Sequence, residues 1–136
     1  MHKSCLTLQN YIVKTMNFSI NDEFNMEQEQ EINIQPKFSR TVNKIDSNSA
    51  EVILGFEVEK DVNIPFSMKI DVCGYFHLND WENPDNSFLM VENTIAILFP
   101  YLRALISMLT ANANIPPYLI PVMNITALFS KKDENQ

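Results

Sequence analysis

The side chains that could carry out acid, base or nucleophilic chemistry are few and widely spaced in this sequence of 136 residues. His77 is the only interior histidine, and it lies between Phe76 and Leu78 with no serine or cysteine nucleophile motif around it. A catalytic histidine must stand beside a nucleophile and be oriented by a further polar group. We therefore interpret His77 as a structural residue and expect the protein not to be an enzyme.

Patterns that would bind a metal or a phosphate are also missing. Asp80, Glu82 and Asp85 share one polar segment, but their spacing is not that of a Ca²⁺-binding loop. The chain has two glycines, Gly55 and Gly74, so it cannot build a glycine-rich loop around a phosphate. The sequence predicts no metal, no nucleotide and no other cofactor.

Charge and cysteine usage restrict the partners and the compartment. The net charge of -7 would repel nucleic acids and anionic membrane surfaces. Cys5 and Cys73 have neither metal-site nor disulfide-framework spacing, which favours a reducing compartment. The N-terminal residues alternate polar and apolar types and do not form the apolar centre of a secretion signal. We expect a cytoplasmic protein without nucleic-acid or membrane partners.

The first half of the chain alternates apolar and polar residues, which is typical of strands with one buried face. Apolar residues hold the even positions in four segments, at residues 6–20, 32–42, 52–58 and 64–72. Tight links between the later segments predict a meander of strands two to four. In the first segment Tyr11 and Val13 occupy the opposite face, which predicts either a bulge or a strand that is covered on both sides. Residues 79–87 are predicted to form a loop.

After that loop the periodicity becomes helical, and residues 95–109 are interrupted only by Arg103 and Ser107. A sheet covers only a stripe of a helix, so we expect another subunit or a bound polypeptide to provide a second cover. The stretch is shorter than the ~20 apolar residues that span a bilayer. Asn93 is the expected N-cap, and Pro100 predicts a kink or a second helix start.

Pro116 and Pro117 are expected to end this helix, and Asn124 to cap a short C-terminal helix. The predicted fold is therefore α+β, a four-stranded antiparallel sheet followed by a long apolar helix and a short one. We expect a single domain over residues 1–130 and a disordered, charged tail over residues 131–136.

Around Pro100 the sequence resembles the SecB family of protein-export chaperones. In that family an Ile-Leu-Phe-Pro-Tyr-x-Arg helix precedes a proline-rich extended stretch and an Asn-x-x-Ala-Leu-aromatic helix. The matching elements here are Ile97-Leu98-Phe99-Pro100-Tyr101-x-Arg103, then Pro116, Pro117 and Pro121-Val122, then Asn124-x-x-Ala127-Leu128-Phe129. The order of strands before the helix also fits, so the resemblance covers nearly the whole chain.

The resemblance implies a dimer of dimers that acts as an ATP-independent holdase, keeping unfolded precursor polypeptides competent for export. Its helices would lie between sheets, and apolar grooves would hold the clients. The helix residues expected at the interface of this homotetramer are Leu98, Tyr101, Leu102, Leu105 and Leu109. The residues expected to line the groove are apolar ones in polar or extended surroundings, namely Phe24, Met26, Tyr118, Ile120, Val122, Leu128 and Phe129.

Family members that deliver clients to the SecA motor use acidic residues near the end of strand one and on the last strand. The aligned positions here are Thr15, Ser19 and Lys69, so we expect SecA docking to be weakened. One alternative is therefore a SecB-like chaperone dedicated to a single client, such as an antitoxin. An alternative of another class is a hot-dog-type thioesterase with Glu92 as its carboxylate, although in that fold the long helix precedes most strands.

Overall fold

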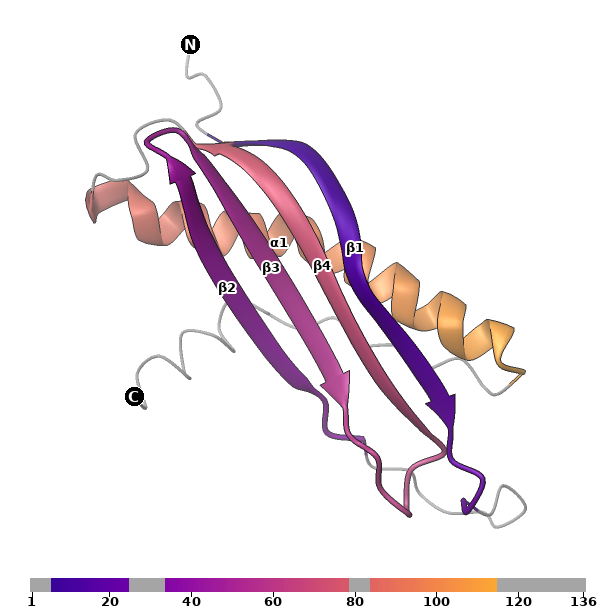
Figure 1. Cartoon of the computed structure of the whole chain (residues 1–136). Helices are drawn as coiled ribbons and strands as arrows, with labels where there is room; N and C mark the ends of the chain where they lie inside the picture. Colours follow the sequence, from indigo (N-terminus) through magenta and orange to yellow (C-terminus); the bar gives the residue numbers. More distant parts are fainter. Residues whose placement is uncertain (1–5, 25–33, 79–83, 115–136) are drawn as a thin grey trace.

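The computed structural model describes residues 6–24, 34–78 and 84–114, the side chains of residues 84–91 excepted. Four strands precede one long helix along the chain (Figure 1). The elements are β1 (Leu6–Ile20), β2 (Lys37–Asp46), β3 (Ser49–Val58), β4 (Phe66–Leu78) and α1 (Pro84–Asn112). The predicted α+β fold with a four-stranded antiparallel sheet before a long helix is confirmed, whereas the short C-terminal helix lies outside the described residues.

The strand order is β1-β4-β3-β2, and all neighbouring strands are antiparallel. Strands β2, β3 and β4 follow one another as the predicted meander, and β1 pairs with the far side of β4. The β2–β3 link is tight because the Asp46 carboxylate accepts a hydrogen bond from the Asn48 amide at 2.8 Å. Between β3 and β4, the Asp61 carboxylate likewise accepts a hydrogen bond from the Asn63 amide, at 2.8 Å.

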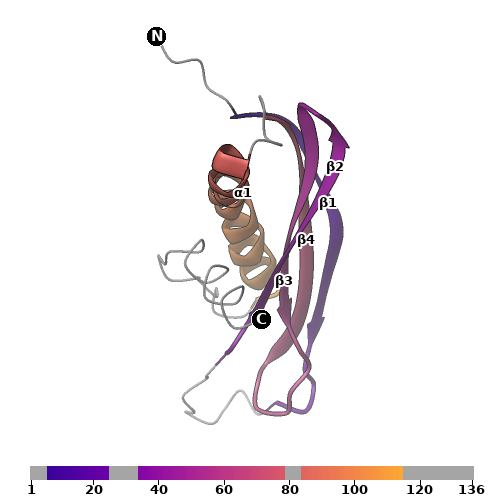
Figure 2. The ribbon, with the colours of Figure 1, turned by 90° about the vertical axis from the view of Figure 1, so that its left-hand side faces the viewer.

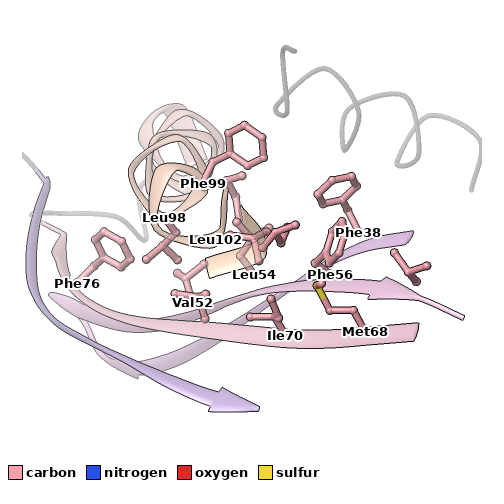
Figure 3. Close-up of a cluster of buried hydrophobic side chains, with 14 of the residues drawn as sticks. Phe38, Val52, Leu54, Phe56, Met68, Ile70, Phe76, Leu98, Phe99 and Leu102 are labelled. Carbon is pink, nitrogen blue, oxygen red and sulfur yellow. The ribbon is translucent and has the colours of Figure 1, made fainter. Parts of the chain in front are cut away.

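Even-numbered residues of β2, β3 and β4 face α1, which lies across one face of the sheet (Figure 2). The register keeps these residues opposite one another, as in the pairs Phe38–Phe56 and Phe56–Ile70. Figure 3 shows how this apolar layer meets the helix residues Leu98 and Leu102. The alternation of the sequence therefore becomes a continuous core on one side of the sheet and leaves the other side polar.

Strand β1 contains two irregularities that change which side chains face the helix. The register with β4 shifts between Leu8 and Asn10 and again between Val13 and Thr15. Each extra residue reverses which positions face the helix. After the first shift Tyr11 and Val13 face the helix, and after the second shift the even positions, beginning with Met16, face it again. The sequence left open a bulge or a strand covered on both sides, and the register shifts are those of a bulge.

Helix α1 is longer than the sequence analysis predicted. It begins at Pro84, so Asn93 lies inside it and is not its N-cap, and residues 84–87 are not part of a loop. Proline is well suited to the first turn of a helix, where its missing N–H costs nothing. The helix runs without interruption through Pro100, so no second start occurs.

The helix ends at Asn112, before the prolines that were expected to stop it. Asn114 follows with φ of 61°, the left-handed conformation that commonly terminates helices. The amide of Ala113 bonds to the Leu109 carbonyl at 3.1 Å and that of Asn114 to the Ala111 carbonyl at 3.2 Å. An asparagine in the left-handed region thus closes α1.

Length and composition alone would allow Glu92–Asn112 to cross a membrane, with a mean hydropathy of 1.6. However, 39% of this apolar segment is buried in the fold, and helices that pack in a protein core can be equally long and equally apolar. The segment is thus weak support for a membrane span, and the expected absence of a membrane partner stays a prediction.

Candidate functional site

Five large apolar side chains of α1 and of the helix-facing side of β1 remain exposed in the single chain. They are Tyr11, Met16 and Ile20 of β1 together with Tyr101 and Met108 of α1. The three β1 residues pair with helix-side positions of β4, and the second half of α1 passes β1 in Figure 1. We call this group the β1–α1 surface. Exposed apolar side chains gathered on one side of a sheet are typical of an interaction surface.

Tyr11 and Tyr101 hold the two halves of this surface together. Their rings stack with centroids 4.4 Å apart and planes at 30°. The first irregularity of β1 makes the contact possible, because without it residue 11 would point to the opposite face of the sheet. Tyr101, which belongs to the Phe-Pro-Tyr segment of α1, therefore contacts the edge strand β1.

The predicted interface residues of the helix divide into two groups. Leu98 and Leu102 are fully buried against the chain's own sheet, so the expectation that they face another subunit is wrong. Leu105 and Leu109 are half-buried at the margin of the same core, and Tyr101 is 38% exposed. These last three remain available to meet a second copy.

Among the predicted groove residues, Phe24 is the one that the structure describes. It is 9% exposed, so the expectation that it is a freely exposed side chain is wrong, while its contact with a client stays a prediction. The other predicted groove residues lie outside the described residues, and they are Met26, Tyr118, Ile120, Val122, Leu128 and Phe129. The described part of the site is therefore the β1–α1 surface and the turn that carries Phe24.

The opposite face of the sheet is polar and carries an ion-pair network. Lys14 Nζ lies 3.3 Å from Glu51 Oε2, and Asn43 Nδ2 donates to Glu51 Oε1 at 3.1 Å. The hydrogen bond from Asn43 is the main cause that lowers the pKa of Glu51, and the hydrogen bond to Glu51 raises the pKa of Lys14. Burial raises the pKa of the neighbouring Cys73 thiol, which makes this cysteine unreactive near neutral pH.

The positions aligned with SecA-docking residues gather on this polar face. Thr15, Ser19 and Lys69 lie on the adjacent strands β1 and β4, where Lys69 is opposite Asn17. Ser19 and Lys69 also line a shallow depression of about 330 Å³ near the end of the sheet. The face carries a lysine and hydroxyl groups at the positions that align with the docking carboxylates of other family members.

Residues considered for catalysis do not form a site in the described part of the chain. His77 is half-buried on the polar face, where the register places it between Thr7 and Ser49. Glu92 lies eight residues inside α1, not at the helix start. No cluster of metal-binding side chains occurs among the described residues.

One long helix lies across a single face of a sheet ordered β1-β4-β3-β2, and a solved SecB-like chaperone has the same fold. The chain belongs to the SecB family, since the family model described as preprotein translocase subunit SecB matches residues 2–136. Membership of this family supports a chaperone role for the chain.

Individual relatives support this membership. The chain is 34% identical to the uncharacterized protein MJ0357 of Methanocaldococcus jannaschii, over 97% of this chain and 87% of the relative. It is 25% identical to the protein-export protein SecB of Nitrosococcus oceani, over 95% and 82% of the two chains. A Mycobacterium tuberculosis SecB-like chaperone, solved with a ChAD peptide from the HigA1 antitoxin, shares the fold with a TM-score of 0.69 at 13% identity, over 88% of this chain and 92% of that one.

Proposed function

We propose that this chain is an ATP-independent holdase that binds unfolded polypeptides and keeps them competent for export. The observation that carries the proposal is the match to the SecB family over residues 2–136. The β1–α1 surface supports it in part, because apolar side chains left exposed in the single chain are typical of a protein that binds other polypeptide chains, whether a second copy or a client. SecB family members are non-enzymatic cytoplasmic chaperones, and we propose the same compartment for this protein.

The energetics of such a surface suit reversible binding. Each client side chain of phenylalanine or leucine size that becomes buried contributes about 1.5–3 kcal/mol. Ordering a flexible client opposes much of this gain, so one site alone binds weakly. Several sites on one oligomer raise the effective concentration of the client and thereby the affinity. We therefore propose a homotetramer whose subunits meet through Tyr101, Leu105, Leu109 and the exposed residues near them.

A second candidate function is a chaperone dedicated to one client, such as an antitoxin. The M. tuberculosis relative was solved with an antitoxin peptide, which favours this possibility. The lysine and hydroxyl groups at positions 15, 19 and 69 favour it as well, because they weaken a docking surface for SecA built on carboxylates. A thioesterase is disfavoured, since α1 follows all four described strands and Glu92 lies well inside it.

The holdase proposal is tested by light scattering of a reduced, aggregating polypeptide without ATP. The protein is expected to suppress aggregation, and Phe24→Ser is expected to weaken this suppression while the oligomer is retained. Because Phe24 is nine-tenths covered, the variant is also expected to melt at a lower temperature, so suppression is measured well below its melting. Ile12→Ser is the matched control, because Ile12 is 41% exposed on the opposite face of the sheet. No suppression by the unmodified protein would reject the proposal.

The client range is measured separately. A general export chaperone should bind several unfolded precursors with similar affinity, whereas a dedicated chaperone should bind one antitoxin segment much more tightly than the precursors. Calorimetry with SecA shows whether the motor docks at all. Tight SecA binding would contradict the weakening inferred from Lys69 and its neighbours.

A further inference from the structure

Asn21 fastens the end of β1 to the turn between β3 and β4. Its side-chain amide donates to the carbonyls of Asp61 and Ile64 at 2.8 and 2.9 Å, and its backbone amide donates to the Pro65 carbonyl at 2.8 Å. The residue is only 7% exposed. A buried amide with both of its N–H groups bonded to carbonyls is costly to disrupt, because both carbonyls would lose this donor, although the Asp61 carbonyl would keep its hydrogen bond from the Ile64 amide.

The same residue closes the turn that carries Phe24. The Glu23 amide donates to Asn21 Oδ1 at 3.0 Å, and the Phe24 amide donates to the Asn21 carbonyl at 3.2 Å. Phe24 is held in this turn with 9% of its surface exposed. The position of Phe24 thus depends on a turn whose first residue is anchored to the sheet.

We propose that Asn21 is a latch that keeps Phe24 covered in the free protein, and that polypeptide binding releases Phe24 from this turn. This inference rests on the proposed function, in which Phe24 contacts the client. A ring that is nine-tenths covered must move before it can be buried against another chain. If the covered and released states are in equilibrium, weakening the covered state increases the population that can bind and therefore tightens binding.

The Asn21→Asp variant tests the latch with an almost isosteric change. Its carboxylate cannot donate to the Asp61 and Ile64 carbonyls and repels both of them. We expect the dissociation constant for a labelled, reduced and alkylated unfolded polypeptide to fall by about threefold to tenfold. Hydrogen exchange at the Phe24 amide should become faster. Asn48→Asp is the control, because it makes the same charge change in an exposed turn at the other end of the sheet.

A double variant separates a latch from a general loss of rigidity. Asn21→Asp combined with Phe24→Ser should bind no more tightly than Phe24→Ser alone, because no phenylalanine remains to be released. A gain that persists in this background, or equal or weaker binding by Asn21→Asp alone, would reject the latch and leave the holdase proposal intact.

The remaining outcomes are also decisive. If the unmodified protein does not bind the labelled polypeptide, the proposed function fails before the latch is considered. If Asn21→Asp does not fold, Asn21→Ser repeats the test, since its hydroxyl retains one donor. If Phe24→Ser unfolds the protein, Phe24 is a core residue and the latch is overturned.

Discussion

The ring of Tyr11 in the edge strand β1 stacks on the ring of Tyr101 in α1, with 4.4 Å between the centroids. This contact joins the two elements whose apolar side chains form the β1–α1 surface. It exists because an irregularity in β1 turns residue 11 toward the helix. The geometry of the surface therefore depends on one extra residue in a strand.

Removing this stack should loosen the attachment of β1 to the helix. We expect Tyr11→Leu and Tyr101→Leu each to lower the free energy of unfolding, with a coupling of about 0.5–1.5 kcal/mol between them. Urea unfolding of the two single variants and the double variant measures the coupling. Strictly additive effects would show that the rings do not interact.

Gly74 sets how closely α1 approaches the sheet. A Cβ atom at this position would lie 2.8 Å from Leu98 Cδ2 and 2.6 Å from Cε2 of the Phe76 ring. Both neighbours are fully buried, so Gly74→Ala should cost about 1–3 kcal/mol of stability. The control is Gly55→Ala, whose nearest neighbours are the ends of the Ser39 and Asp71 side chains, which can rotate away. An equal loss at both positions would contradict this account.

The network of Lys14, Glu51 and Asn43 on the polar face predicts that stability depends on pH on the acid side. The pKa of Glu51 is lowered in the folded state, so its contribution is present above its unfolded pKa of about 4.3 and is lost as pH falls through the lower folded value. Glu51→Gln should therefore flatten the acid side of the profile of melting temperature against pH. Glu59→Gln should change it less, because the Lys37–Glu59 pair is more exposed. An unchanged acid side in Glu51→Gln would show that the network adds no stability.

Assembly should depend on the part of α1 that the sheet leaves uncovered. Met108 is 45% exposed, so Met108→Glu should shift the protein to a smaller species in sedimentation velocity while the circular dichroism spectrum is retained. Ile12→Glu introduces the same charge at a similarly exposed site on the opposite face and should leave the mass unchanged. A monomer without any substitution would refute the proposed tetramer.

The sequence was sufficient for the strands because their alternation matches burial on one face. The residues Val52, Leu54 and Phe56 occupy even positions, and all three are buried under the helix. The irregularity of β1 could also be predicted, because Tyr11 and Val13 break the parity of the strand. Tertiary packing only reinforced a pattern already present in the chain.

The start of the helix and the state of Phe24 were missed for identifiable reasons. The polar composition of residues 79–87 predicts a loop, although Pro84 is a typical first helical residue. Phe24 appeared exposed because its neighbours in the sequence are polar. It is buried in a turn that begins at Asn21, and Asn21 bonds to a turn 40 and more residues away, which no local pattern reveals.

The pairing of β1 with β4 has a consequence for how the chain reaches its fold. Leu6 lies opposite Leu78, so the first strand cannot be completed until more than half of the chain has left the ribosome. The meander of β2, β3 and β4 involves contacts between near neighbours in sequence and can form early, whereas closing β1 onto it brings distant segments together and is slow. During synthesis the apolar strand β1 therefore remains unpaired until β4 has emerged, and in this state it is prone to aggregate.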